Sequence, residues 1–225
     1  MRIIFVRHGH PDYQQDCLTE LGHRHAEAAA QRLSEETIDR FFTSSCGRAV
    51  ETAEHIAARF QNPPLVQLDF MREIRWRTPG VIHDGQPWKI AADCVKEGMT
   101  LHDPAWRETG PFSACNVVAE EEKIRQGFDV WMAELGYIRE GEYYRVKGGT
   151  EDTVLLVSHG GSSSVVLAHL LNLQLPLLCK VLRPNFTAIT VVRLEGEEGE
   201  LVSPTVELAN DARHIAGMTA EEFFR

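Results

Sequence analysis

Two short apolar segments, each followed directly by a His-Gly pair, constrain the fold of this chain more than any other feature. Residues 2–6 precede Arg7 and His8, and residues 153–157 precede a second such pair that begins at His159. Continuous Val, Ile and Leu runs of this length are typical of parallel strands that are buried on both faces. Ligands of open parallel sheets bind outside the carboxyl ends of the strands. The two segments therefore predict that His8 and His159 meet at one edge of a parallel sheet, beside Arg7.

A third segment predicts another basic residue at the same edge. Residues 41–45 have the pattern of a short strand, and a helix follows, for which Ser44 and Ser45 are candidate N-cap residues. Arg48 then lies in the first helical turn. A cation there adds to the positive end of the helix dipole, unless an anion is bound above it. We therefore predict that Arg48 binds an anion, with simple solvation of its side chain as the alternative.

The order of these motifs along the chain resembles the histidine phosphatase superfamily, which includes cofactor-dependent phosphoglycerate mutases and many phosphomonoesterases. The residues that carry the resemblance are Arg7-His8-Gly9, Leu18-Thr19-Glu20-Leu21-Gly22 with Ala26, Ser44-Ser45 with Arg48-Ala49 and Thr52-Ala53, Val157-Ser158-His159-Gly160, and Asn210-Asp211 with His214. They span most of the chain. The resemblance implies that His8 is the nucleophile that becomes phosphohistidine, and that Arg7, Arg48 and His159 form the phosphate pocket.

The chemistry of these side chains fits the implied reaction. Histidine is a recognised covalent nucleophile, and an arginine fork donates two hydrogen bonds to a phosphate while keeping its charge. Two arginines beside His8 should lower its pKa and leave one ring nitrogen free to attack. Because Arg7, Arg48 and, when protonated, His159 supply the positive charge, we expect no metal and no other cofactor.

A proton donor for the leaving oxygen is also needed. The resemblance places the acid/base glutamate of the family at Glu73, which completes a predicted catalytic set with His8 and His159. An extended segment would project Glu73 and Arg75 to the same side. A nearby arginine lowers a carboxyl pKa, whereas burial raises it, so the sequence leaves open whether Glu73 donates a proton or forms an ion pair. The acidic residues held in reserve are Asp84, Glu120, Glu121 and Glu122.

Three positions depart from the family pattern and bear on substrate choice. Members often have glutamate, glutamine or a small residue where this chain has His10, asparagine where it has Gln14, and glutamine where it has His25. We predict His10, Gln14 and Gly160 as substrate contacts. The amide of Gln14 is one methylene farther from the backbone than that of asparagine, and Gly160 offers its backbone N–H.

A metal site is the alternative interpretation of the first motif. His8 and His10 are spaced as a ligand pair, and His83 or His102 would be further ligands, as in metal-dependent hydrolases. The paired arginines argue against a divalent cation in the same pocket, and the sequence shows no coherent set of carboxylates. We therefore predict that the site holds no metal, with this alternative left open.

The predicted fold is an α/β three-layer αβα sandwich with a mostly parallel central sheet, formed by a single domain over residues 1–225. The chain is long enough for one hydrophobic core. Residues 76–150 contain all four tryptophans, and we interpret them as a mainly helical insertion that caps the site. The remaining expected elements are helices at 18–34, 48–60 and 162–173, a strand at 65–68, and hairpin strands at 187–195 and 201–207.

Charge and cysteine content narrow the partners and the compartment. A net charge of −10 argues against nucleic acid or an anionic membrane as a general partner. No apolar run approaches the roughly 20 residues that span a bilayer, and the apolar run after Arg2 is too short for a signal peptide. The five cysteines are scattered, which favours free thiols in a reducing compartment. We expect a cytoplasmic protein, and its oligomeric state stays open.

The function predicted from the sequence is therefore hydrolysis of a small phosphorylated metabolite through phosphohistidine on His8. One alternative is a phosphoglycerate mutase-type phosphotransferase, although the longer signature of such enzymes around the acid glutamate and their later Gly-Glu-Ser are not legible. A second alternative is a non-catalytic phosphate-binding regulatory domain, against which the intact Arg7, His8, Arg48 and His159 count.

Overall fold

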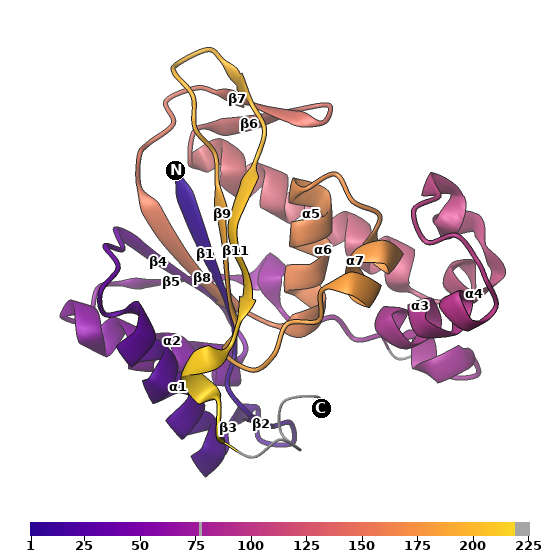
Figure 1. Ribbon diagram of the computed structural model, residues 1–225, viewed down its shortest axis with the longest axis horizontal. Helices are drawn as coiled ribbons and strands as arrows, with labels where there is room; N and C mark the ends of the chain where they lie inside the picture. The colour runs from indigo at the N-terminus through magenta and orange to yellow at the C-terminus, as the bar shows by residue number, and fades with distance from the viewer. Residues whose placement is uncertain (77, 219–225) are drawn as a thin grey trace.

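The computed structural model describes residues 1–76 and 78–218, and a six-stranded sheet lies at its centre (Figure 1). The strand order is β11-β9-β1-β8-β4-β5. Four adjacent strands run parallel, namely β1 (Arg2–Arg7), β8 (Thr153–Ser158), β4 (Arg40–Ser44) and β5 (Leu65–Leu68). The other two, β9 (Ile189–Arg193) and β11 (Thr205–Asp211), complete one side of the sheet, with β9 antiparallel to both β1 and β11. The prediction of a mostly parallel central sheet is confirmed.

The continuous apolar runs are explained by burial on both faces of the sheet. In β1, Ile3 and Phe5 belong to one core cluster, whereas Ile4 and Val6 belong to the other. Strand β8 alternates in the same way, and β1 and β8 pair so that Arg7 lies opposite Ser158. Because alternate side chains point to opposite faces, a strand between two helical layers needs apolar residues at every position. This register also brings His8 and His159, the next residues along, to one edge of the sheet.

Helices cover each face and form three layers, as predicted (Figure 1). One face is covered by α1 (Glu20–Leu33) and α2 (Gly47–Ala57), which is extended by η1 (Ala58–Phe60). The other face is covered by α5 (Val117–Glu134), α6 (Gly160–Leu170) and α7 (Leu175–Val181). Helix α6 is buried on nearly all sides, because α5 and α7 both pack against it.

Most expected boundaries are close to those observed, and two differ for an identifiable reason. Helix α1 starts at Glu20 because Thr19 is its N-cap, with Oγ1 accepting a hydrogen bond from Gly22 N at 3.1 Å. The prediction that Ser44 or Ser45 caps α2 is wrong. Cys46 is the N-cap residue and its side chain makes no capping bond. A carboxylate from a distant loop takes that place, and it belongs to the site described below.

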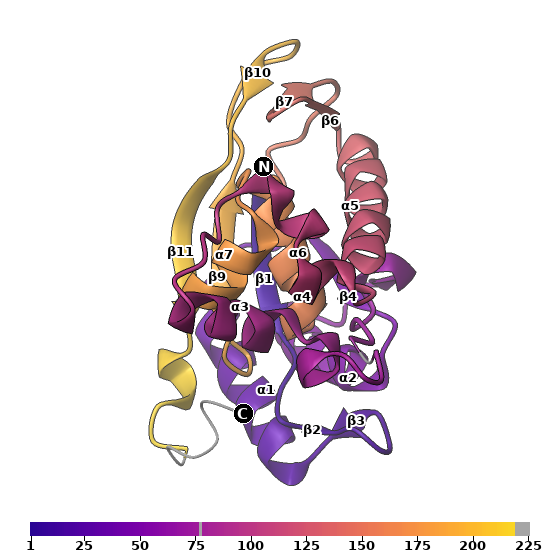
Figure 2. The same cartoon turned by 90° about the vertical axis from the view of Figure 1, so that its right-hand side faces the viewer.

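The predicted hairpin near the C-terminus is right only in part. Strand β9 does pair with β11, but the expected strand at 201–207 is divided. Its first part forms β10 (Leu201–Val202), which joins β7 (Tyr143–Val146) and β6 (Tyr137–Glu140) in a separate three-stranded sheet. Figure 2 shows this small sheet at the opposite end of the molecule from β2 (Pro11–Asp12) and β3 (Cys17–Leu18).

Residues 76–150 contribute to two different parts of the molecule. Helix α5 is part of the main layer, where Phe128 and Trp131 share the core cluster of Phe42. Helix α3 (Pro87–Lys96) instead packs on α7, and α4 (Gly110–Ser113) lies nearby (Figure 2). The remaining short helical segments are η2 (Asp69–Met71), η3 (Ile82–Gly85), η4 (Pro104–Glu108) and η5 (Arg213–Ile215). Within the described residues no single helix is long and apolar enough to cross a membrane, and only the bent pair of α6 and α7, taken together, has that length and composition.

Candidate active site

The carboxyl ends of β1, β8 and β4 bring together the four side chains that the sequence motifs single out. His8 follows β1 and His159 follows β8, both buried, with their ring centroids 5.1 Å apart. Arg48 lies in the first turn of α2, after β4, and its Nε donates to His8 Nε2 at 3.3 Å. Arg7 is the last residue of β1. These residues come from three strand ends that only the parallel register makes neighbours.

The imidazole of His8 is held in one tautomer by its own backbone. Its Nδ1 lies 2.7 Å from the carbonyl oxygen of Gly9, and because a carbonyl can only accept, Nδ1 carries the proton. Nε2 is then the nitrogen with the free electron pair, which faces the Arg48 Nε–H. Burial, followed by the charges of His159, Arg7 and Arg48, holds the pKa of His8 well below its usual value. His8 is therefore neutral, in agreement with the direction predicted from its arginine neighbours.

His159 is anchored at one nitrogen and free at the other. Its Nε2 lies 2.7 Å from Ser44 Oγ, whereas its buried Nδ1 has no hydrogen-bond partner in the described part of the chain. Burial is the largest cause that lowers the pKa of His159, and Arg48 and Arg7 lower it further. In the absence of an anion this imidazole is neutral, so the positive charge of the pocket comes from the arginines.

The Arg7 side chain is held by two contacts, and one of its N–H groups has no partner among the described residues. Its Nη1 donates to the carbonyl oxygen of Pro184 at 2.8 Å, and its guanidinium stacks over the ring of Phe186 at 4.1 Å from the centroid. Its Nε–H is buried without a partner among the described residues. Buried polar groups are nearly always hydrogen-bonded, so the unpaired Arg7 Nε–H and the unpaired His159 Nδ1 indicate a place for a group from outside the protein. An acceptor suits Arg7, and it also suits His159 in the tautomer in which Ser44 Oγ donates to Nε2 and Nδ1 carries the proton.

Asp16 holds the Arg48 side chain and the start of its helix together. One carboxylate oxygen accepts from Arg48 Nη1, and the other accepts from Gly47 N at 2.9 Å. A side chain at Gly47 would not fit, since a Cβ there would lie 2.3 Å from the carbonyl oxygen of Asp16. Asp16 was not predicted from the sequence, because it binds the start of a helix whose residues are about 30 positions away along the chain. A glycine at the first position of a predicted helix was the only local signal.

Glu73 reaches the same pocket from an irregular segment after η2. Its Oε1 accepts from Ile74 N at 2.9 Å, and its Oε2 accepts from Gly161 N at 3.4 Å. Burial raises the pKa of Glu73 and outweighs the opposing hydrogen bonds and the charges of Arg7 and Arg48. Arg75, which we expected to act on Glu73, is exposed and is not a cause of the shift. A carboxyl group with a raised pKa is suited to donating a proton.

The reserve acids lie elsewhere. Asp84 is exposed, and it has a positive φ of 52° within η3. Glu120 pairs with Lys123, and Glu121 is paired with Arg107 in a separate cluster. None of them lines the cavities at the site. Among the described residues the carboxyl groups that do so are Glu73 and Asp16, and Asp16 is paired with Arg48.

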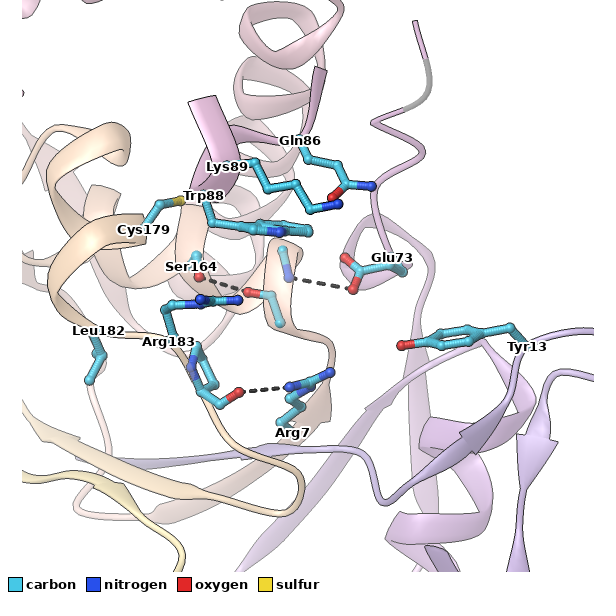
Figure 3. Close-up of a pocket in the computed structure, with 13 residues that line it drawn as sticks. Arg7, Tyr13, Glu73, Gln86, Trp88, Lys89, Ser164, Cys179, Leu182 and Arg183 are labelled. Atoms are coloured by element: carbon cyan, nitrogen blue, oxygen red, sulfur yellow. Dashed lines mark hydrogen bonds between the residues drawn. The ribbon is translucent and has the colours of Figure 1, made fainter. Parts of the chain in front are cut away.

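Two adjoining cavities open at the site. The one drawn in Figure 3 has a volume of about 360 Å³. The other has a volume of about 790 Å³ and contains Arg48 and Asp16. Both are lined by the same four side chains, Tyr13, Glu73, Gln86 and Trp88. Tyr13, Gln86 and Trp88 were not predicted from the sequence. They lie in a loop or at the start of α3, and no local sequence pattern indicates that such residues come close to the edge of a distant sheet.

The predicted substrate contacts are placed differently from one another. Gly160 lines the smaller cavity. Gln14 is exposed and lines neither cavity, while its neighbour Tyr13 lines both. His10 lines neither; its Nδ1 lies 2.9 Å from Thr19 Oγ1, and its ring packs edge-on against Phe186. His25, the third departure from the family pattern, is buried near the same phenylalanine.

The structure does not gather the ligands that the metal alternative requires. Within residues 1–76 and 78–218, no group of three His, Cys, Asp or Glu side chains is arranged to hold a metal ion. His83 is bonded to Asp93, with His83 Nε2 2.5 Å from Asp93 Oδ2, and His102 is exposed. Neither lines the two cavities.

Comparison with known proteins identifies the class to which this fold and site belong. The model of the histidine phosphatase superfamily (branch 1) matches residues 3–115, which are 113 of the 225 residues. The chain therefore belongs to the histidine phosphatase superfamily. A comparison with curated protein sequences gives no match.

Solved structures with a similar fold include several phosphatases. A phosphoserine phosphatase mutant from Entamoeba histolytica, in complex with phosphoserine, is 18% identical with a TM-score of 0.61, over 95% of this chain and 98% of that one. A mycobacterial glucosyl-3-phosphoglycerate phosphatase with inorganic phosphate is 22% identical with a TM-score of 0.64, over 96% and 99%. A protein described as mycobacterial hydrolase 2 is 24% identical with a TM-score of 0.64, over 93% and 90%.

Proposed function

We propose that this protein is a phosphomonoesterase that hydrolyses a small phosphorylated metabolite through a phosphohistidine intermediate on His8. The observation that carries the proposal is a pair of buried nitrogens without partners among the described residues in the site of His8, whose Nε2 accepts a hydrogen bond from Arg48 Nε. Arg7 Nε and His159 Nδ1 are buried without a partner in the described residues, beside the unprotonated nitrogen of a neutral imidazole. A phosphoryl group offers three acceptor oxygens, which suit the Arg7 Nε–H and the tautomer of His159 that carries its proton on Nδ1.

The first step of the proposed reaction transfers the phosphoryl group to His8. The electron pair of His8 Nε2 attacks phosphorus, so that a P–N bond forms while the ester P–O bond breaks. Charge on the equatorial oxygens is stabilised by Arg7, Arg48 and His159, which is the main demand of phosphoryl transfer. The leaving oxygen takes the proton of Glu73, whose raised pKa keeps the carboxyl group protonated over a wider pH range.

The second step returns His8 to its starting form. Water attacks the phosphohistidine and the P–N bond breaks, while the Glu73 carboxylate accepts the proton of water. Inorganic phosphate then leaves, and both His8 and Glu73 are restored. No step draws on a metal ion, because the arginines supply the charge, and metal independence is therefore part of the proposal.

Two further observations support the proposal. The structural neighbours named above include phosphatases of phosphoserine and of glucosyl-3-phosphoglycerate, both small phosphorylated metabolites. The five cysteines are all free thiols, which agrees with our proposal that the enzyme works in the cytoplasm.

Trapping the intermediate tests the proposal directly. Rapid quench with a labelled phosphomonoester should capture a phosphoryl group on the protein that is labile in acid and stable in base. The label should be absent from His8→Ala and present in His102→Ala, in which an exposed histidine away from the cavities is changed. Activity should survive dialysis against a strong chelator. Label on a serine or aspartate would contradict the mechanism, and isomerisation of 2- or 3-phosphoglycerate without release of phosphate would make the protein a mutase.

A further inference from the structure

The cavity in Figure 3 contains two cations that the phosphoryl-transfer chemistry does not use. Lys89 belongs to α3, and Arg183 belongs to the loop between α7 and β9. Both side chains are exposed at the cavity. In the described part of the chain neither one forms an ion pair with a carboxylate, although most of the other arginines there do so. Two unpaired cations in one cavity of a protein with a net charge of −10 require an explanation.

The other groups that line this cavity do not neutralise Lys89 and Arg183. Among the described residues that line the cavity, the only carboxyl group is that of Glu73, whose pKa is raised by burial. The Cys179 thiol has its pKa raised to about 12, also by burial, so it carries no charge. The Ser164 hydroxyl is engaged, since its Oγ donates to the carbonyl oxygen of Gly160 at 2.7 Å. The lining is therefore strongly positive, and Arg7 adds to it.

The position of Arg183 relative to the phosphate pocket is fixed by its backbone. The carbonyl oxygen of Arg183 accepts from Asn210 Nδ2 at 2.9 Å, and Asn210 Oδ1 accepts from Asn185 N at 2.9 Å. Between them, the Pro184 carbonyl holds the guanidinium of Arg7 at 2.8 Å. The loop that contains Pro184 thus orients Arg7, and the same loop contains Arg183.

Lys89 approaches from the facing wall. Figure 3 shows Lys89 and Trp88 above the cavity, Arg7 below it, Arg183 on one side, and Glu73 with Tyr13 on the other. The indole of Trp88 packs edge-on against the indole of Trp76, with their ring centroids 6.0 Å apart. A substrate that has its phosphate at Arg7 and its leaving oxygen near Glu73, and whose remaining atoms occupy this cavity rather than the larger one, brings those atoms close to Lys89 and Arg183.

We propose that the alcohol portion of the substrate carries a second anionic group, and that Lys89 and Arg183 bind it. The proposal rests on the phosphatase function proposed above and names the class of its substrate. Because the cavity of about 360 Å³ also receives the leaving group, the second anion lies close to the phosphate, as in a small phosphorylated carboxylic acid or a short bisphosphate. A neutral alcohol of the same size leaves both cations unpaired.

Matched substrates test this class. Glycerol 3-phosphate and 3-phosphoglycerate have the same carbon skeleton and differ in one carboxylate, and glycerol 1,3-bisphosphate replaces that group by a second phosphate. We expect kcat/KM to be about 25- to 100-fold higher for an anionic member than for glycerol 3-phosphate, the combined effect of two charge-assisted contacts. The preference should decrease with added salt, because the cations are exposed. The better anionic substrate tells whether a carboxylate or a phosphate is preferred.

Substitutions test whether Lys89 and Arg183 cause the preference for an anionic substrate. Lys89→Gln and Arg183→Gln should each raise KM for the preferred anionic substrate by about 5- to 10-fold, and should change the kinetics with glycerol 3-phosphate less than 2-fold. Lys96→Gln and Lys180→Gln are the matched controls, since these exposed lysines lie on α3 and α7 but line neither cavity. The controls should keep the wild-type preference, and circular dichroism checks that all four variants are folded.

The outcomes separate this inference from the function on which it rests. Hydrolysis of nitrophenyl phosphate and glycerol 3-phosphate without a preference for either anionic ester, or a preference that survives both cavity substitutions, would overturn the inference and leave the phosphatase intact. Failure to release phosphate from any ester would overturn the phosphatase. In that event calorimetric titration of the wild-type protein with the same three ligands decides the inference, and equal affinities would reject it.

Discussion

Two clusters of buried ionisable side chains in this protein differ in their hydrogen bonding. At the carboxyl ends of the strands, Arg7 Nε and His159 Nδ1 have no partner in the described residues. Between α5, α6 and η4, Glu121 accepts from Arg107 Nε at 3.0 Å and from Nη2 at 2.6 Å. There His169 is also satisfied at both nitrogens, with Arg125 Nε 3.1 Å from Nδ1 and Asp129 Oδ1 2.8 Å from Nε2.

The difference distinguishes a structural cluster from a binding site. Removing charge from water costs free energy that hydrogen-bonded and oppositely charged partners offset. The Glu121 cluster has such partners, although burial still raises the pKa of Glu121. It ties α5 to η4, and α5 to α6. The cluster at His8 leaves donors open, so its desolvation is offset only when an external anion binds. Positions that bind ligands are often kept at some cost in stability, and the two clusters should therefore respond to mutation in opposite ways.

The largest expected effect is on catalysis at the open cluster. His8→Ala should lower turnover on the order of 10⁴-fold or more, since the nucleophile is lost, while the midpoint of urea unfolding should not decrease by more than a small amount. The neutral ring makes few polar contacts that hold the fold together. Turnover and denaturant unfolding of the same preparation measure the two quantities. A variant that unfolds readily would indicate that His8 is structural.

Glu73→Gln should have the next largest effect on turnover, and it should also change the pH profile of activity. Activity requires neutral His8 and protonated Glu73, so it should fall below the lowered pKa of His8 and above the raised pKa of Glu73. The substitution should reduce turnover of alkyl phosphates by about 10²-fold or more and remove the alkaline limb of the pH profile. The loss should be smaller with nitrophenyl phosphate, whose leaving group needs little protonation. Wild-type rates on alkyl esters would show that another group is the acid.

The closed cluster should show the reverse behaviour. Arg107→Met leaves the carboxylate of Glu121, which is only 5% exposed, without its bidentate partner. We expect a loss of about 2 kcal/mol in the free energy of unfolding, below the full cost of breaking a buried pair because the Arg107 side chain is 31% exposed. The kcat of the folded protein should be unchanged. The double variant with Glu121→Gln should recover part of the stability, and an equally unstable double variant would argue against this explanation.

The smallest expected effect concerns the ion pair between Asp211, which is buried, and Arg213, which is exposed. Hydrogen bonds from Arg213 lower the pKa of Asp211 to about 2, from an ordinary value of 3.8. A lowered carboxyl pKa stabilises the fold above the unfolded-state pKa, and this contribution is lost as the pH falls from about 4 to about 2. Arg213 is 82% exposed, so solvent screening leaves about 1 kcal/mol or less. Asp211→Asn should flatten the pH dependence of thermal unfolding in that range, and an unchanged profile would contradict this assignment.

The central fold and the histidine–arginine cluster followed from local patterns because those patterns have local causes. A strand buried on both faces must be apolar throughout, and β1 and β8 are. Arg48 in a first helical turn is locally unfavourable, which marked it as a ligand-binding residue. Tyr13, Lys89 and Arg183 have no such mark, because the sequence around them is compatible with ordinary loops and an ordinary helix surface.

What the sequence alone determined is thus the sheet, the helices that cover it, and the residues that its parallel strands carry to one edge. Only the tertiary structure decided their electrostatic state. The pKa of Glu73 depends on burial by a segment that contains Gly161, and the pKa of His159 is lowered by burial and by three remote arginines. Asp16 restrains Arg48 from a distant loop. Periodicity reports which face of an element is buried, whereas desolvation and Coulomb interactions depend on every group that folding brings within a few ångströms.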